Sequence, residues 1–366
     1  MKVHYSNPEI LLINNPSHFG VRAVGLAYKR AFEFLGVKFS YYDFRNRPTV
    51  STDEANGNIM SLLAENRSYK LIIMIQPSYM LANLYLYLKE YQGKGTHFIA
   101  ICTEDPYSTY ATIPIGDLFS VIYTNELEIE KLYNNVVKQI KYLPVAWDSL
   151  QPYKKIDGRI YDITFIMTMY ESRLKYLAPC CNNHFNGDIF IAGAIGPLFN
   201  SENIIDFSSI GSKMPVVVPR HVEYHVYEQS KIVINPHREE SNTGRSFFNL
   251  GEGVKCKQMI KRAYSPNPRF FDVCAMGAIC MSDRLGCFDL LRESGISDVM
   301  AFDLNPYDDY LAKIKELLRM LNTGVELRLE LGKMMRFFRE NHSYVIRAKE
   351  ILNHVGKNFV ELDPYV

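Results

Sequence analysis

Residues 265–283 read SPNPRFFDVCAMGAICMSD, and the fold can be inferred outward from this stretch. Its two prolines keep the backbone extended before the apolar part begins. Residues 269–276 predict a short helix, with Gly277 at its C-cap. Residues 278–282 then form a compact apolar run of strand length. The stretch therefore predicts a short helix that leads into a buried strand.

The start of this predicted helix is a candidate anion site. Free backbone N–H groups and the positive end of the helix dipole lie there, next to Asn267, and Arg269 adds a cation. A plainer interpretation treats Arg269 and Asp272 as a surface ion pair three residues apart, worth about 0.3 kcal/mol. Both interpretations stay open from the residues alone.

The rest of the chain alternates apolar runs with amphipathic segments, which indicates two doubly wound parallel α/β domains. The irregular sequence 147–158 suggests a link between them. We expect an N-terminal domain over 1–150, a C-terminal domain over 151–340 and a helix within 341–366 that packs back towards the first domain. The predicted strands are 10–13, 37–43, 71–75, 97–103, 119–124, 140–145, 162–167, 188–192, 214–218, 231–235, 278–282 and 299–303. The predicted helices include 21–35, 306–321, 325–339 and 344–355.

Composition narrows the function classes. The formal net charge is +1, which argues against binding to nucleic acid mainly through counterion release. Seven cysteines without a C-x-x-C spacing suggest free thiols in a reducing compartment, so we expect a cytoplasmic protein. The most apolar region, 71–88, is interrupted by polar residues and proline, and we expect no membrane span.

Four segments of the second half resemble a known family. They are YDITFIMTMYESR, YEQSKIVINPHR, the 265–283 stretch and HSYVIRAKEIL, with looser matches at ILLINNPSHFG, CTEDPY, VIYTNE and LPVAWD. Together they are similar to the CgeB-like glycosyltransferases. The resemblance implies the GT-B fold, with two facing Rossmann-like domains and a deep cleft between them, and a UDP-sugar as donor. It also implies that position 272, usually Glu and here Asp272, binds the nucleotide ribose.

Candidate donor-binding residues lie in the second half. Strands of open α/β sheets present ligand-binding residues at their carboxyl ends. Asn235, His237 and Arg238 follow one predicted strand, and Arg173 follows another. Departure of a sugar from a diphosphate builds negative charge on the leaving group, which fixed cations or a metal must stabilise. The sequence has no D-x-D motif, so arginines in a metal-independent site are the preferred interpretation.

Candidate acceptor-side residues lie in the first half. The loop after the first predicted strand contains Asn15, Ser17, His18 and Gly20. His18 is a candidate base for an acceptor hydroxyl, because an imidazole titrates near neutral pH. The pair Glu104 and Asp105 ends another strand and offers a carboxylate base, although Asp105 before a proline also suits a helix cap.

The sequence as a whole predicts a hexosyltransferase that moves a sugar from a nucleotide-sugar to a hydroxyl acceptor. The acceptor, whether glycan, protein, small molecule or modified DNA base, stays open, as do the sugar, the stereochemistry and the oligomeric state. Two alternatives remain: a DNA-modifying glycosyltransferase, for which the basic run 255–262 would face the acceptor, and a nucleotide-binding protein without catalysis. The Gly-rich part of 241–253 is a candidate flap. His221 and His225 share a helical spacing without an evident third metal ligand.

Overall fold

The computed structural model describes most of the chain, and its internal contacts divide the chain into two compact units. Of the described residues, those within 9–145 and 344–358 and Ala263 belong to the first unit, and those within 146–237 and 264–343 belong to the second. The described residues are 9–14, 19–43, 51–65, 69–78, 80–129, 133, 137–153, 158–168, 171–180, 185–193, 220–237, 263–305 and 309–358.

A parallel sheet forms the centre of the first unit. Its described strands have the order β2-β1-β3-β4-β5-β6. All five residues of both β1 and β3 are buried, as continuous apolar runs in a doubly covered sheet require. The strands are β1 (Ile10–Asn14), β2 (Phe39–Asp43), β3 (Leu71–Ile75), β4 (His97–Cys102), β5 (Val121–Thr124) and β6 (Ile140–Tyr142). Each was predicted, with ends that differ by at most three residues.

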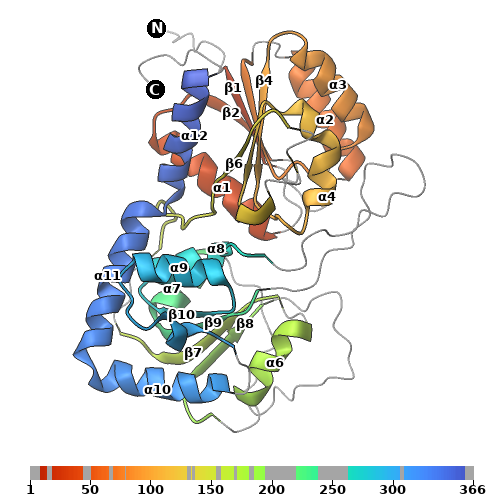
Figure 1. Cartoon of the computed structure of the whole chain (residues 1–366). Coiled ribbons are helices and arrows are strands. Elements are labelled where there is room, and N and C mark those ends of the chain that lie inside the picture. Colours follow the sequence, from red (N-terminus) through yellow and green to blue (C-terminus); the bar gives the residue numbers. More distant parts are fainter. Residues whose placement is uncertain are drawn as a thin grey trace. The chain divides into compact units, whose positions relative to one another are not determined.

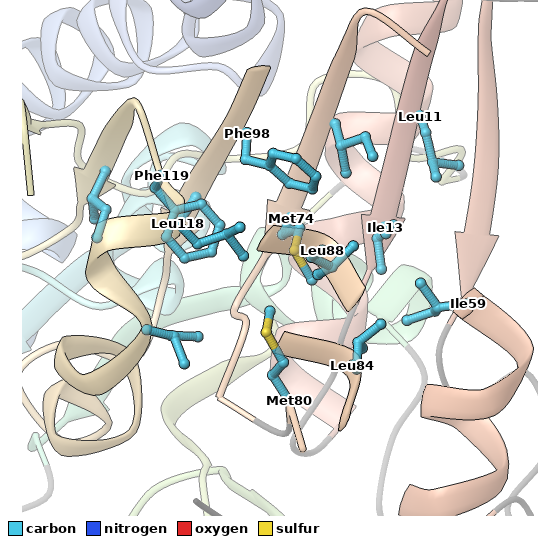
Figure 2. Close-up of a cluster of buried hydrophobic side chains, with 14 of the residues drawn as sticks. Leu11, Ile13, Ile59, Met74, Met80, Leu84, Leu88, Phe98, Leu118 and Phe119 are labelled. Carbon is cyan, nitrogen blue, oxygen red and sulfur yellow. The ribbon is translucent and has the colours of Figure 1, made fainter. Parts of the chain in front are cut away.

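Helices cover both faces of this sheet. Figure 1 shows α1 and α12 on one side of it and α2 and α3 on the other. On the second side, Leu11 and Ile13 of β1 belong to one buried cluster with Ile59, Leu84 and Leu88 from the helices (Figure 2). The helical elements are α1 (Phe19–Phe34), α2 (Thr52–Glu65), α3 (Ala82–Gln92), α4 (Thr109–Thr112), η1 (Ile113–Leu118), η2 (Leu127–Ile129) and α12 (Tyr344–Asn358).

The last described helix, α12, belongs to the first unit although it follows the whole second unit in the chain. The ring of Tyr344 lies edge-on to that of Tyr28 in α1, with centroids 5.0 Å apart. Arg347 Nε donates to the carbonyl oxygen of Pro144 at 3.0 Å. These contacts attach the helix to α1 and to the segment that follows β6.

A second parallel sheet organises the second unit. Its described strands have the order β10-β9-β7-β8. They are β7 (Tyr161–Ile166), β8 (Ile189–Ala192), β9 (Ser230–Asn235) and β10 (Ile279–Ser282). The helical elements are α6 (Glu171–Pro179), α7 (Arg220–Glu228), α8 (Pro268–Ala275), α9 (Leu285–Glu293), η5 (Val299–Phe302), α10 (Tyr310–Thr323) and α11 (Val325–Asn341). The two described sheets are thus built from parallel strands with helical connections, as predicted.

The predicted strand 299–303 is wrong. These residues form the 3-10 turn η5, and Asp303 makes one isolated parallel bridge to Ser282. The Asp298 side chain accepts from the Ala301 backbone N–H and so favours a turn over an extended strand. The predicted strand 214–218 lies outside the described residues.

The 265–283 stretch has the structure its sequence predicts, with α8 shifted by one residue. Gly277 follows the C-cap with a φ of +76°. The Gly277 N–H donates to the carbonyl oxygen of Cys274 and the Ala278 N–H to that of Val273, which is a Schellman ending. The glycine therefore turns the chain directly from α8 into β10. Among the described helices, none is both long and apolar enough to cross a membrane.

Candidate functional site

The candidate site of the second unit lies at the carboxyl edge of its sheet. In the order β10-β9-β7-β8, the chain changes direction between β7 and β9, and ligands of open α/β sheets bind at such a point. β9 ends in Asn235, which is followed by Pro236 and His237, while β10 ends in Ser282 and is followed by Asp283. The polar residues of adjacent parallel strands therefore meet at one edge.

The helix α8 begins at this edge. Asn267 is its N-cap, and the Asn267 side-chain oxygen accepts from the backbone N–H of Phe270 at 3.1 Å. Pro268 occupies the first turn, where the missing N–H costs no helical hydrogen bond. This local sequence explains why the helix starts here and why Arg269 lies in its first turn.

Arg269 is held by an amide pair. The side chains of Asn235 and Asn267 donate to each other's carbonyl oxygens at 3.2 and 3.0 Å. The Asn235 oxygen also accepts from Arg269 Nη1 at 3.1 Å. The guanidinium is thus bound to the end of β9 and, through Asn235, is linked to the N-cap of α8. The structure brings together three of the predicted donor-site residues.

His237 is buried and forms hydrogen bonds through both ring nitrogens. Nδ1 lies 3.0 Å from Asp283 Oδ1, and Nε2 accepts from the Asn267 backbone N–H at 3.1 Å. Burial lowers the pKa of His237 to about 4, although the hydrogen bond to Asp283 opposes this change. Asp283 has its pKa lowered well below the usual range, because the bonds from His237 outweigh the opposing effect of burial. The pair therefore consists of a neutral imidazole and an ionised carboxylate at neutral pH.

Two further arginines contribute positive charge at this edge. Arg173 lies in the first turn of α6, as expected, is 7% exposed and donates from Nη1 to the Thr168 carbonyl oxygen at 3.1 Å. Arg284 is 1% exposed, and its Nη1 lies 3.3 Å from Asp283 Oδ2. Both arginines contribute to the low pKa of His237. With Arg269 they make the edge suitable for an anionic group.

Asp272 lies on the buried side of α8. It is fully buried, and its Oδ1 accepts from the Tyr224 hydroxyl at 2.9 Å. That hydroxyl accepts in turn from the Asp148 backbone N–H at 3.0 Å. The interpretation of Arg269 and Asp272 as a surface ion pair is therefore wrong, because Asp272 is not at the surface.

The carboxyl edge of the first unit's sheet is organised by Gln76, directly after β3. Gln76 is buried and has a φ of +51°. Its Oε1 accepts from the backbone N–H groups of Thr103 and Glu104, at 2.8 and 3.0 Å. The Gln76 side chain thereby fixes the loop that leaves β4. Glu104 is half-buried, so part of it reaches solvent.

Asp105, the next residue of this loop, is 2% exposed. Oδ2 accepts from the Thr124 hydroxyl at 2.7 Å, and Oδ1 accepts from the hydroxyls of Thr109 and Tyr133, at 3.1 and 3.5 Å. Burial raises the pKa of Asp105 to about 6, against the effect of these bonds. The carboxylate faces hydroxyl groups of the protein, whereas its neighbour Glu104 is the more accessible.

The remaining candidates are less well defined. Asn15, Ser17, His18 and Arg238 lie outside the described residues, as do the predicted flap and the basic run 255–262. Gly20 lies in the first turn of α1. In the part of the chain that the structure describes, no group of three or more His, Cys, Asp or Glu residues is placed to hold a metal ion.

Sequence reasoning missed Asp283, Arg284 and Gln76. The first two follow the apolar strand of the 265–283 stretch, so the strand-end rule that selected Asn235 would have selected them too. Nothing local marks Gln76, whose partners lie 27 and 28 residues further along the chain.

Comparisons with known proteins identify the fold. No family model matches the chain, and no curated protein does. Solved structures match over nearly the whole chain. One is BGT of T4 phage in complex with its UDP-glucose substrate, with a TM-score of 0.55 and 12% identity, covering 96% of this chain and 99% of that one. The chain has the GT-B fold.

Two further matches agree with this fold. A structure of the DNA-modifying enzyme β-glucosyltransferase covers 95% of this chain and 98% of its own, with a TM-score of 0.54 and 11% identity. AviGT4, a glycosyltransferase of avilamycin A biosynthesis, covers 96% and 98%, with a TM-score of 0.53 and 11% identity. The GT-B fold predicted from the sequence is confirmed, while the narrower CgeB-like family is not.

Proposed function

We propose that this protein is a glycosyltransferase that moves a sugar from a nucleotide-sugar, with UDP as the first candidate nucleotide, to a hydroxyl acceptor. One observation carries the proposal: Arg269 is held by Asn235 at the start of α8, on the carboxyl edge of the second sheet. A cation at a helix N-terminus suits a diphosphate. The GT-B fold and the UDP-glucose complex of T4 phage BGT support it.

The proposed reaction is a displacement at the anomeric carbon of the sugar. The acceptor oxygen forms a bond to this carbon, the bond between the carbon and the diphosphate oxygen breaks, and its electron pair leaves with the diphosphate. The acceptor proton passes to a base. Arg173 and Arg269 would stabilise the negative charge that develops on the leaving diphosphate. The proposal therefore assigns the donor to the second unit, and it assigns the acceptor to the first.

For the base, Glu104 is the stronger candidate of the adjacent pair. Its carboxylate is partly accessible and its backbone is fixed by Gln76. Asp105 has a pKa of about 6, which suits proton transfer. Its carboxylate oxygens, however, already accept hydrogen bonds from hydroxyl groups of the protein. A base at Glu104 fits a single displacement with inversion, whereas a retaining reaction would need no protein base there.

The resemblance to CgeB-like enzymes assigns the ribose to Asp272. In this structure the carboxylate is buried and accepts from Tyr224, so ribose binding through it requires that hydrogen bond to be exchanged. Asp272→Asn removes the charge at nearly constant volume. If Asp272 binds ribose, the variant should lose affinity for UDP and for uridine alike, whereas unchanged affinity for both would remove Asp272 from the site.

We propose that catalysis needs no metal, because arginines supply positive charge at the candidate diphosphate site, and that the protein works in the cytoplasm. T4 phage BGT has also been solved with UDP and Mn²⁺, so the test must include this ion. Turnover in EDTA equal to turnover with Mn²⁺ is the expected result. Loss of activity in EDTA that Mn²⁺ restores would overturn metal independence.

Binding and turnover test the two halves of the proposal separately. Arg269→Ala should weaken UDP binding by at least about tenfold, the effect of one lost charge-assisted bond, while leaving the fold intact. Glu104→Gln should leave UDP affinity unchanged and lower the release of UDP from a UDP-sugar. Unaltered UDP affinity in Arg269→Ala would refute the donor site, and unaltered turnover in Glu104→Gln would exclude that base.

A second candidate function is transfer to a hydroxylated base in DNA. It is favoured by the similarity of the whole chain to a DNA-modifying β-glucosyltransferase. DNA containing hydroxymethylated bases would then serve as acceptor, and its binding would weaken steeply with salt. If UDP is released from a UDP-sugar at the same rate with and without such DNA, at about 50 mM salt or below, then DNA is excluded as the acceptor. Nucleotide binding without any turnover would indicate a protein that has lost catalysis.

A further inference from the structure

His237 has a defined tautomer in this structure. The Asn267 backbone N–H can only donate, so Nε2 of His237 must be the unprotonated acceptor. Nδ1 then carries the proton and donates it to Asp283 Oδ1. Both ring nitrogens form hydrogen bonds within the protein, so the ring has no nitrogen left to bind the nucleotide-sugar or to transfer a proton. The direct contact with the nucleotide-sugar that the sequence position of His237 suggests is therefore not what the structure favours.

Asp283 sets the orientation of this ring. Its Oδ1 accepts both from Nδ1 and from the backbone N–H of His237, each at 3.0 Å, so the ends of β9 and β10 are joined. Arg284 faces the other carboxylate oxygen at 3.3 Å and favours the ionised form. An ionised Asp283 in turn selects the imidazole that carries its proton on Nδ1.

The imidazole ring holds the start of α8 in place, and the start of α8 in turn positions Arg269. By accepting the Asn267 N–H, His237 fixes the residue that caps the helix. The Asn267 side chain then pairs with Asn235, whose oxygen accepts from Arg269. A continuous set of hydrogen bonds thus runs from Asp283 to the guanidinium.

We propose that His237 is a positioning residue, oriented by Asp283, which places Arg269 for the leaving diphosphate. The inference rests on the proposed function, because Arg269 needs placing only if an anion binds there. His237 would then affect the affinity for the ligand by positioning Arg269, without itself contacting the ligand.

The first test measures the tautomer and needs no ligand. Two-bond ¹H–¹⁵N correlation spectra of the full chain labelled at histidine, recorded at pH 7, should show one ring protonated on Nδ1 alone. The signal should vanish in His237→Phe, which identifies it. A His237 ring protonated on Nε2, or on both nitrogens, at pH 7 would overturn the inference.

The second test measures UDP affinity by calorimetry in a double-mutant cycle. We expect His237→Phe to weaken UDP binding about tenfold, but less than about twofold when Arg269 is already alanine, because residues that act through one another are not additive. If the two losses multiply fully in the double variant, or if His237→Phe binds UDP as the wild type does, the inference is wrong. A wild type that binds no UDP would instead refute the proposed function.

A control and a substitute variant complete the design. Asp162 pairs with Lys231 at 2.6 Å in the same sheet, at the amino ends of β7 and β9. Asp162→Asn should leave UDP affinity within about twofold of the wild type, and a loss as large as that of His237→Phe would show a general effect of destabilising the sheet. If His237→Phe does not fold, Asp283→Ala takes its place in the cycle, because it removes the acceptor of the Nδ1 proton. Its effect on UDP affinity should likewise be much smaller when Arg269 is already alanine.

Discussion

At the scale of single residues, the two units contain buried acids with opposite pKa shifts. Asp283 is held ionised by hydrogen bonds from His237 and by the positive charge of Arg284. Asp105 accepts hydrogen bonds from hydroxyl groups instead, and burial raises its pKa to about 6. A hydroxyl donor stabilises a carboxylate less than a cation does. Ionisation of Asp105 therefore opposes folding at neutral pH.

The stability of the protein should therefore depend on pH through Asp105. The folded state keeps the Asp105 proton up to about pH 6, whereas the unfolded chain releases it near its ordinary value of 3.8. The favourable contribution of this group is complete below pH 3.8 and is lost as the pH rises through 6. On going from pH 4 to pH 7, Asp105→Asn should thus gain about 2.4 kcal/mol of stability relative to the wild type, measured by urea unfolding.

Thr124→Val serves as the comparison for this prediction. It removes the hydroxyl that donates to Asp105 Oδ2 at 2.7 Å, so the carboxylate becomes harder to ionise and the loss of stability with rising pH should be larger than in the wild type. If Asp105→Asn and the wild type differ by the same free energy at pH 4 and at pH 7, the raised pKa of Asp105 is wrong.

At the scale of elements, α1 approaches β1 closely through one glycine. A Cβ atom added to Gly25 would lie 2.1 Å from the side chain of Asn14, which is fully buried at the end of β1. Asn14 is held in place by a hydrogen bond from Nδ2 to the Tyr41 hydroxyl at 3.1 Å. The helix and the strand can therefore pack at this distance only without a side chain at position 25.

Gly25→Ala should destabilise the first unit by roughly 1–3 kcal/mol, the usual cost of overpacking. Gly332→Ala is the matched control, because Gly332 lies in the exposed part of α11 with open space around it. There the same substitution should stabilise the protein by up to about 1 kcal/mol through helix propensity. Denaturant titration of both variants measures these changes in the free energy of unfolding. Equal changes in the two variants would show that position 25 has more room than the structure gives it.

Most elements could be predicted from the sequence because apolar runs and glycine caps are local signals. The strand β3 and the ending of α8 at Gly277 are examples. The site could be predicted only by position, at strand ends and at the start of the predicted helix. The strand-end rule found Asn235 and His237, but their partners, the N-cap of α8 and the residue after β10, lie 30 to 46 residues away. Their roles depend on tertiary contacts that no local pattern records.

At the scale of the whole molecule, the chain returns to the first unit through α12. The side chains of Ala348, Ile351 and Val355 are fully buried there. Ile351→Ala should cost about 2–5 kcal/mol, as for other large-to-small changes in a core. Hydrogen exchange should then increase in β1 and β3 and stay unchanged in β7 and β9.

Lys349→Ala, an exposed change on the same helix, should leave exchange in both sheets unaltered. Faster exchange in the second sheet alone for Ile351→Ala would contradict the assignment of α12 to the first unit.

The measurement that tests the central claim most directly is thermal unfolding of the wild type and Arg269→Ala with UDP, GDP, ADP, CMP, TDP and their sugar conjugates, in EDTA and with Mn²⁺. A ligand at a hundred times its dissociation constant adds about 2.7 kcal/mol to the free energy of unfolding. We predict that a uridine nucleotide raises the melting temperature of the wild type in EDTA and raises that of Arg269→Ala much less. An absence of any shift in the wild type, or equal shifts in both proteins, would contradict a nucleotide-sugar site at Arg269.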